Sequence, residues 1–529
     1  MREAHEVADV RSAEQSLMAL VPDGALMQRA AAGLAAVCAG LLGRVYGARV
    51  VVLAGTGDNG GDALFAGARL ARRGAQVAAV QTGATLHAAG ADAFRAAGGE
   101  IHGPGEAGAD DAGAGGSAAA GPGSSGAGGH GAAAAIATAD LIIDGILGIG
   151  GHGGLREPAA TLAALTGQAA ADGALVVAAD LPSGVDADTG VVSGPAIRAD
   201  VTVTFGTIKP GLLIDPGASY AGTVQLVDIG LGPHLTARPA ARALQSADVA
   251  VLLPEPGTES DKYRRGVLGV LAGSRRYTGA AVLSVGGAIR GGAGMVRLVS
   301  AGPAADLVRA HWPEAVITVL GPDDPAVASG AAAIEAAGRV QAWVAGPGLG
   351  TGDDVAELLG EVLGTDLPVL VDADGLTVLT RRKDLLSGRD PARTLITPHA
   401  GELARLTGGD HDEIEAHRLE SARRAADDLG VTVLLKGSTT VVAAPGGGSA
   451  YVNSTGTPWL ATAGSGDVLS GLAGALLAQG VGPAAAAGAV AAFLHGLAGR
   501  LAARDAPIGA SDVLGAIPDA IRVARLGDA

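Results

Sequence analysis

The sequence predicts two α/β domains with buried parallel strands. Short runs rich in valine and alanine alternate with helical stretches along most of the 529 residues, and this alternation is typical of βαβ units. The apolar runs end at glycine-rich or polar turns, and open α/β sheets bind ligands beyond the carboxyl ends of their strands. A chain of this length exceeds one ordinary hydrophobic core, so two or three domains are expected.

The first domain is predicted from a regular succession of helices and strands. The expected helices cover 25–43 and 63–73, and the expected strands cover 49–54, 76–80, 140–143, 174–179 and 201–205. This order indicates a Rossmann-like three-layer domain over residues 1–232. Residues 103–135 consist almost entirely of glycine, alanine and serine, so we expect a flexible insertion there with no core of its own.

The same alternation restarts after a segment rich in proline, arginine and alanine. Residues 233–246 are expected to be a linker, and residues 247–529 a second α/β domain. Its expected elements are strands at 266–271, 295–299, 342–345, 369–371, 395–396 and 431–435 and a helix at 280–290.

Composition excludes several classes of protein. The net charge is −16, and the sequence has no cluster of basic residues that could contact a nucleic-acid backbone. Nucleic-acid binding is therefore not expected. A single cysteine, Cys38, excludes an intramolecular disulfide and a cysteine-rich zinc site. The N-terminus lacks a signal-peptide pattern, and the apolar stretches are interrupted by glycine or charge, so we expect a cytoplasmic protein without a membrane span.

The first glycine-rich loop, Gly55–Asp62 (GTGDNGGD), follows a predicted strand and opens a helix. Its glycines match the dinucleotide-binding pattern, so a Rossmann dehydrogenase is an alternative. That pattern requires a carboxylate at the end of the next strand, where this chain has Gln81 and Thr82. The dehydrogenase interpretation is therefore weakened.

Oxygen-bearing side chains follow several strands of this domain. Asn59, Asp62, Asp144, Asp180 and Ser183 should converge at one edge of the sheet. Few full charges and several neutral oxygens suit K⁺ better than Zn²⁺, with Mg²⁺ left open. Helix caps and turns are the alternative for each residue taken alone. The group as a whole favours a site.

The second glycine-rich loop, Gly456–Gly471 (GTPWLATAGSGDVLSG), also opens a helix. Backbone N–H groups around Gly464–Gly466 can hold a phosphoryl group, whereas Asp467 suits proton acceptance from a hydroxyl. An aspartate that favours the helix dipole is the structural alternative. Lys436 and His399 follow strands of the same domain, and no P-loop sequence occurs.

Together these motifs resemble those of the bifunctional NAD(P)H-hydrate repair enzymes over nearly the whole chain. GTGDNGGD, DGILGIGGHG and DLPSGVDADTG resemble the epimerase half. GAGMV, GPGLG, TPHAGE, LLKGS and GSGDVLSG resemble the dehydratase half, which has a ribokinase-like fold. Where the family usually has NGGDG, this chain has Ala63, and we expect its small methyl group to be tolerated unless a positive φ is required there.

The resemblance implies a role for each matching residue. In the epimerase half, K⁺ would be bound by Asn59, Asp144 and Ser183. The hydrate would be bound there by Asn59, Gly60, Gly61, Asp62, Ala63, Gly148, Ile149, Gly150, Gly151, His152, Gly153, Gly154 and Asp180, with Asp180 catalytic. In the dehydratase half, the hydrate would be bound by Ala281, Gly348, His399 and catalytic Asp467. The nucleotide would be bound by Lys436, Gly437, Ser438, Thr439, Thr440, Gly464, Ser465 and Gly466.

The implied reaction repairs hydrated, redox-inactive NAD(P)H. The first half interconverts the two epimers, and the second dehydrates the S epimer by phosphorylating the ring hydroxyl and eliminating phosphate. The implied cofactors are K⁺ for the epimerase and Mg²⁺ for the dehydratase, with ADP as the expected co-substrate and a homo-oligomer as the expected assembly. A small-molecule kinase in the second domain, or a first domain used as a binding scaffold, are the alternatives.

Overall fold

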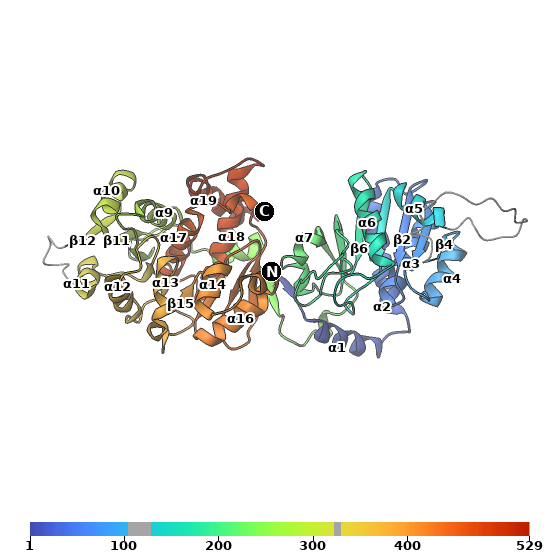
Figure 1. Ribbon diagram of the computed structural model, residues 1–529, viewed down its shortest axis with the longest axis horizontal. Coiled ribbons are helices and arrows are strands. Elements are labelled where there is room, and N and C mark those ends of the chain that lie inside the picture. The colour runs from blue at the N-terminus through green and yellow to red at the C-terminus, as the bar shows by residue number, and fades with distance from the viewer. Residues whose placement is uncertain (104–128, 322–329, 528–529) are drawn as a thin grey trace, which may run out of the picture. The chain divides into compact units, whose positions relative to one another are not determined.

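The computed structural model describes residues 1–103, 129–321 and 330–527, which form two compact units (Figure 1). One unit is Ala4–Pro239, and the other combines Met1–Glu3 with Ala240–Ala529. The division at Pro239 lies inside the segment expected to be a linker, but that segment also contributes strand β9 (Ala241–Ala243). The first three residues, expected in the first domain, instead belong to the second unit, where β1 (Arg2–Ala4) follows β9 at the sheet edge.

The N-terminal unit has a seven-stranded parallel sheet in the order β4-β3-β2-β5-β6-β7-β8. Its strands are β2 (Arg49–Ala54), β3 (Gln76–Gln81), β4 (Glu100–His102), β5 (Leu141–Gly145), β6 (Leu175–Ala179), β7 (Val201–Phe205) and β8 (Thr223–Val227). Its helices are α1 (Val7–Met18), α2 (Ala25–Leu42), α3 (Asp58–Ala71), α4 (Ala88–Ala96), α5 (Gly129–Ala137), α6 (Ala159–Ala171) and α7 (Gly217–Ala221). Chain order reverses between β2 and β5, and such switch points are where open α/β sheets bind ligands. The predicted fold class is confirmed.

Two segments of this unit differ from the prediction. Helix α3 begins at Asp58 rather than at residue 63, so the NGGD residues form its first turns. This is possible because Gly60 lies against the backbone of Gly55, where an added Cβ would come within 2.2 Å of the Gly55 carbonyl oxygen. Ala63 lies inside the helix and its φ is not positive. Alanine therefore adopts the backbone conformation of this position without strain.

Part of the expected insertion is ordered core. Residues 104–128 lie outside the described residues, but Gly129–Ala137 form α5. Ala132 and Ile136 of this helix are fully buried in a hydrophobic cluster. Alanine has the highest intrinsic helix propensity, and a single isoleucine supplies the buried anchor. The flexible insertion predicted over 103–135 was therefore too long at its C-terminal end.

The C-terminal unit has an eleven-stranded sheet in the order β1-β9-β18-β17-β16-β15-β14-β13-β10-β11-β12. The further strands are β10 (Val267–Leu271), β11 (Met295–Ala301), β12 (Val316–Leu320), β13 (Ala342–Ala345), β14 (Val369–Val371), β15 (Thr394–Ile396), β16 (Thr432–Leu435), β17 (Thr440–Ala443) and β18 (Ala450–Asn453). The strands from β12 to β16 are parallel, whereas β17 is antiparallel to both neighbours. Chain order switches between β10 and β13, which again marks a ligand-binding edge.

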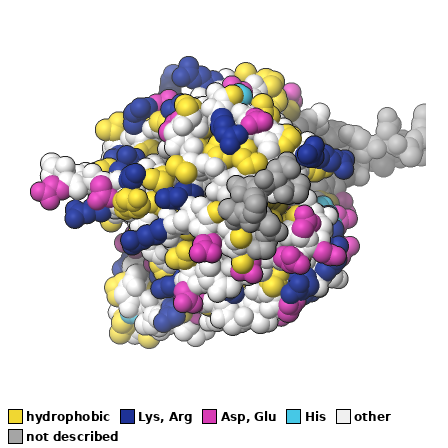
Figure 2. All heavy atoms as spheres, turned by 90° about the vertical axis from the view of Figure 1, so that its left-hand side faces the viewer, with side chains coloured by type: hydrophobic (Ala, Val, Ile, Leu, Met, Phe, Trp, Pro, Cys, Tyr) yellow, Lys and Arg dark blue, Asp and Glu magenta, His cyan; other side chains and the backbone are white. Residues whose placement is uncertain are grey.

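Helices cover this sheet, and the three at the C-terminus form much of its core. The helices are α8 (Ser246–Leu252), α9 (Thr278–Arg290), α10 (Gly302–His311), α11 (Gly330–Ala337), α12 (Asp353–Leu363), α13 (Asp374–Arg381), α14 (Ala400–Thr407), α15 (His411–Ala416), α16 (Arg418–Leu429), α17 (Ser465–Ala478), α18 (Ala484–Ala503) and α19 (Ala510–Leu526). Figure 2 shows a mixed surface of charged and apolar side chains on the face of the molecule at the left of Figure 1.

Two helices of the described chain, α2 and α18, are long and apolar enough to cross a membrane by length and composition. This differs from the expectation that glycine or charged residues interrupt every apolar stretch before it is long enough to span a membrane. Most of α18 is buried in the core of its unit, and α2 packs Leu34 and Cys38 into the core of the other. Core helices pass the same test, so these two helices are only a weak indication of a membrane span.

Candidate active sites

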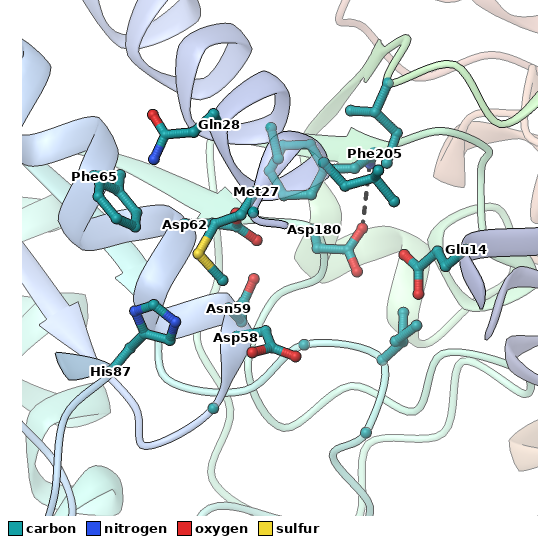
Figure 3. A pocket seen from close by; sticks show the side chains of 18 of the residues that line it. Glu14, Met27, Gln28, Asp58, Asn59, Asp62, Phe65, His87, Asp180 and Phe205 are labelled. Carbon is teal, nitrogen blue, oxygen red and sulfur yellow. Dashed lines mark hydrogen bonds between the residues drawn. The ribbon is translucent and has the colours of Figure 1, made fainter. Parts of the chain in front are cut away.

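A cavity of about 930 Å³ lies beside the switch between β2 and β5 (Figure 3). Its wall contains several of the residues predicted to bind the hydrate, namely Asn59, Asp62, Gly148, Ile149, Gly150, Gly151 and Asp180. Helices α1 and α2 close the other side with Glu14 and Met27 among others. The predicted convergence of residues at this edge is therefore present for Asn59, Asp62 and Asp180.

Asp180 follows β6 and is held by a buried lysine. The Lys209 Nζ atom lies 2.5 Å from Asp180 Oδ1, and both side chains are buried. The Thr204 hydroxyl and the Phe205 backbone N–H also donate to Oδ1, at 3.1 and 3.2 Å. Asp180 has a φ of +64°, a strained region that aspartate tolerates better than most residues. Such strain persists only where the surroundings fix it, often at functional sites.

Other carboxylates share this cavity. Burial raises the pKa of Asp62 well above its usual value, and the charges of Asp180, Asp58 and Glu14 add to the effect. Burial likewise raises the pKa of Glu14, with Lys209 opposing and Asp180 reinforcing the shift. In the described residues, Asp62 Oδ1 is buried and has no hydrogen-bond partner. Groups of this kind in a cavity are typical of a proton-transfer or polar binding site.

The three predicted K⁺ ligands lie in one hydrogen-bonded cluster. Asp144 is fully buried and accepts from the Ser183 hydroxyl at 2.6 Å and from the Ser183 backbone N–H at 2.8 Å. Burial raises the pKa of Asp144 to about 6. The Asn59 side-chain N–H donates to the Leu147 carbonyl at 2.9 Å, while Asn59 Oδ1 is buried without a partner in the described part of the chain.

The second site lies at the N-terminal end of α17, where Asp467 occupies the first turn. Gly464, with φ +87°, precedes the helix. Burial and the carboxylate of Asp372 raise the pKa of Asp467 to about 7, against the opposing charge of Lys436. A carboxylate with a pKa near neutrality is well matched to general-base catalysis.

An ionic network around the buried Asp372 supports this turn. Lys436 Nζ lies 2.8 Å from Asp372 Oδ1 and 3.7 Å from Glu402 Oε2. Ser470 of α17 donates to Asp372 Oδ2 at 2.6 Å. Burial alone would lower the pKa of Lys436, but the two carboxylates outweigh it and raise that pKa. A Cβ added to Gly466 would lie 3.5 Å from Lys436 Nζ, so the ammonium group is next to the glycine turn.

The comparisons with known proteins cover both units. A family described as "YjeF-related protein N-terminus" matches residues 23–211, and "NAD(P)H-hydrate dehydratase" matches residues 268–518. The bifunctional NAD(P)H-hydrate repair enzyme Nnr of Mycobacterium leprae is 46% identical over 511 residues, or 96% of this chain and 95% of that protein. The chain belongs to the family of bifunctional NAD(P)H-hydrate repair enzymes. The predicted family is confirmed.

More distant members of the repair-enzyme family also span both units. The protein of the same name from Moorella thermoacetica is 34% identical over 91% of this chain and 88% of its own length. Among solved structures, an ADP/ATP-dependent NAD(P)H-hydrate dehydratase from Bacillus subtilis, co-crystallised with ATP and Mg²⁺, is 28% identical. It covers 53% of this chain and 97% of its own, with a TM-score of 0.45.

Some residues predicted for the epimerase half of the repair enzyme lie outside the cavity wall. Gly60, Gly61, Ala63, His152, Gly153 and Gly154 are not among its lining residues. Ala63 is fully buried inside its unit. The exposed His152 has its Nδ1 3.2 Å from Asp186 Oδ2.

The predicted dehydratase residues also divide into groups. Lys436, Gly466 and Asp467 lie together, as described above. Ala281 is fully buried in the hydrophobic core, so its side chain has no exposed surface for a ligand. Thr439 is buried and Thr440 begins β17, whereas Gly437 and Ser438 are exposed.

The buried Arg418 packs against the loop that contains Gly437. A Cβ at Gly437 would lie 1.9 Å from the Arg418 guanidinium, so this position admits only glycine while Arg418 stays in place.

The remaining predicted dehydratase residues have local roles. His399 caps α14 by accepting from the Gly401 N–H at 3.1 Å. Gly348 has φ +60° and lies against Tyr277. The Ser465 carbonyl accepts from His495 Nε2 at 2.9 Å. Burial lowers the pKa of His495 to about 4, so the ring is neutral and its Nε2–H is the donor.

Sequence reasoning missed four polar residues that build these sites. Lys209 holds Asp180, Glu14 faces the first cavity, Asp372 binds Lys436, and Arg418 supports Gly437. Asp372 directly follows the strand predicted at 369–371 and was recognisable there as a strand-end residue, although the sequence assigned it no role. Lys209 follows β7 by four residues and could have been found in the same way. Glu14 lies on a helix before the first βαβ unit, and no local pattern relates it to the sheet edge.

Proposed function

We propose that Asp180 is the catalytic base for epimerisation of NAD(P)H hydrates, and that Asp467 is the catalytic base for ADP-dependent dehydration of the S hydrate. Family membership supports the two reactions. The observation that supports the assignment of residues is that each unit places a carboxylate near a lysine at its own switch-point edge. Asp180 is buried against Lys209, and the half-buried Asp467 lies close enough to Lys436 for the lysine charge to lower its pKa. The predicted hydrate and nucleotide residues around these two carboxylates are part of the same proposal.

In the dehydratase half, Asp467 accepts the proton of the ring hydroxyl while the hydroxyl oxygen attacks the terminal phosphorus of ADP. AMP leaves, and the backbone N–H groups of the α17 turn stabilise the charge on the transferring group. Phosphate then departs with the ring oxygen while the adjacent ring carbon loses a proton, which restores the dihydronicotinamide double bond. Lys436, beside Gly466, adds positive charge near the phosphoryl group.

We also propose that Mg²⁺ enters this half with the nucleotide. The described residues contain no cluster of three or more His, Cys, Asp or Glu side chains arranged for a metal. Mg²⁺ commonly binds substrate phosphates through one or two carboxylates and several waters, and Asp374 and Glu402 are the carboxylates near Asp467 besides Asp372. The donor set therefore fits an ion that neutralises phosphate charge.

In the epimerase half, Asn59, Asp144 and Ser183 fit K⁺. Asn59 Oδ1 is a buried oxygen without a donor in the described part of the chain, and Asp144 is a buried carboxylate that forms no ion pair there. A monovalent cation would supply the compensating charge and fix the loop that follows β5. The residues themselves orient the cavity wall through the Asn59–Leu147 and Ser183–Asp144 hydrogen bonds.

Potassium is expected to stabilise the N-terminal unit specifically. At about 100 times its dissociation constant, one bound ion contributes about 2.7 kcal/mol to the free energy of unfolding. Thermal unfolding in KCl should therefore occur at a higher temperature than in tetramethylammonium chloride of equal ionic strength. The variant Ser183→Ala should lose most of this difference. Equal unfolding temperatures of the wild-type protein in the two salts would contradict the K⁺ proposal.

The whole function can be followed in one reaction on a mixture of both NADH hydrates. With ADP, absorbance of restored NADH should rise in a fast phase, from the S hydrate present at the start, and then in a slower phase limited by epimerisation. The rate constant of the fast phase is expected to be lower with ATP than with ADP. Recovery that is faster with ATP would contradict the nucleotide assignment, and no recovery with either would contradict the proposed activity.

We further propose a cytoplasmic location and a homo-oligomer. The single cysteine, which is buried, supports a reducing compartment. The acidic net charge argues against a nucleic-acid partner. Light scattering of the purified chain tests the assembly.

A further inference from the structure

The epimerase cavity contains a carboxylate, Glu14, that faces Asp180 from a different element. Glu14 lies on α1, whereas Asp180 follows β6 at the sheet edge, and both line the same cavity. Figure 3 shows the two carboxylates facing the same part of this cavity. They are close enough for the charge of Asp180 to affect the pKa of Glu14. A flat ring in the cavity would therefore meet carboxylates supplied by two separate elements.

The two carboxylates have opposite surroundings. Asp180 Oδ1 accepts from Lys209, Thr204 and the Phe205 backbone N–H, and these donors stabilise a carboxylate anion. The Glu14 carboxylate forms neither an ion pair nor a hydrogen bond in the described structure. Burial raises its pKa, Asp180 and Asp58 raise it further, and Lys209 and Arg11 oppose the shift. A pair of carboxylates whose environments differ in this way is suited to act as one acid and one base.

We infer that Glu14 is a second catalytic residue of the epimerase, which donates a proton to the departing ring hydroxyl while Asp180 activates the water that adds to the opposite face. The inference rests on the proposed role of Asp180 and adds a partner to it. Asp62 also lines the cavity and is likewise only partly buried. It is less suited to this role because its Oδ1 atom is sealed from solvent, whereas Glu14 faces Asp180 from a separate helix.

The step balances with water as the only co-reactant. The ring nitrogen's lone pair forms a C=N bond to the hydroxyl-bearing carbon as the C–O bond breaks, and the leaving oxygen takes the Glu14 proton to become water. A second water then adds to the other face of the planar iminium carbon. Its proton passes to Asp180, and the electron pair returns to the ring nitrogen. The result is inversion at one carbon, and the reverse reaction exchanges the roles of acid and base.

The variant Glu14→Gln tests this role in the full-length protein with mixed NADH hydrates and ADP. General acid catalysis contributes about 10²–10⁴-fold, so the slow phase should lose at least about 100-fold in rate constant, with little change in the hydrate concentration for half-maximal rate. The fast phase should be unchanged. Asp9→Asn is the matched control, because Asp9 lies on the same helix but does not line the cavity. This variant should retain both phases.

Oxygen-18 water gives a second test on the wild-type protein. Each inversion should introduce one solvent oxygen into the epimerised hydrate, and a product that keeps its original oxygen would overturn the inference. An unchanged slow phase in Glu14→Gln would also overturn it. If Asp180→Asn abolishes the slow phase while Glu14→Gln does not, only the role of Glu14 is wrong. If both variants retain it, the proposed epimerase site itself is wrong.

Discussion

Replacing Asp467 with asparagine is expected to slow dehydration of the S hydrate by about 10²–10⁴-fold, the usual contribution of a general base. Asparagine retains the size of the side chain but cannot accept the hydroxyl proton. It also removes a negative charge near the incoming phosphates, so nucleotide binding should be unchanged or tighter. The fast phase of NADH recovery should therefore disappear, while the exchange between the two hydrates, followed by chromatography, continues.

The pH dependence gives an independent check on the same residue. Asp467 must be ionised to act as a base, and its pKa is raised to about 7. The dehydration rate of the wild-type protein should therefore fall by about tenfold per pH unit below that value. Asp372→Asn removes the nearby carboxylate that contributes to the shift, so it should move this limb of the profile to lower pH.

A control separates catalysis from helix stability. Asp353 also lies in the first turn of a helix, α12, but is exposed and away from the glycine turn. Asp353→Asn removes the same favourable interaction with a helix dipole, worth about 0.3–1 kcal/mol, and should leave recovery unchanged. Asp467→Asn with a normal fast phase would show that Asp467 is only a helix-stabilising residue.

The sequence was sufficient to predict that several of the candidate residues lie together at a sheet edge. In parallel sheets the strands end at one edge, so short apolar runs followed by polar residues place Asn59 and Asp180 together without knowledge of any contact. The same reasoning places Lys436 near the α17 turn, because one follows a strand and the other begins a helix. These inferences depend on the strands being parallel, which the alternation of strands and helices along the chain indicates.

The sequence was not sufficient to predict which partners hold the catalytic groups. Lys209 is almost fully buried against Asp180, although lysine is seldom buried unless paired, and a single lysine in a sequence gives no sign of its partner. Glu14 enters the cavity through the packing of α1, which is set by tertiary contacts. The alanine-rich segment before β5 has the composition of a linker, yet Ile136 is enough to fix a helix on the core.

Replacing Asp180 with asparagine is expected to abolish enzymatic epimerisation, with a loss of about 10²–10⁴-fold, and to leave dehydration of the S hydrate unchanged. NADH recovery should then stop near the fraction of S hydrate present at the start, apart from uncatalysed exchange. Asparagine also tolerates the positive φ of this position, so the backbone should be retained. Loss of both phases would contradict two independent sites.

The buried partner of Asp180 allows stability and catalysis to be separated. Removing one member of a buried ion pair costs about 3–5 kcal/mol because the other charge is left uncompensated, and here Asp180→Asn would leave the Lys209 ammonium in that state. The double variant Asp180→Asn/Lys209→Met removes both charges and should regain much of the lost unfolding free energy. If Asp180 is the base, this stabilised variant still shows no slow phase. Recovery of epimerisation along with stability would instead mean that Asp180 serves only to balance the charge of Lys209.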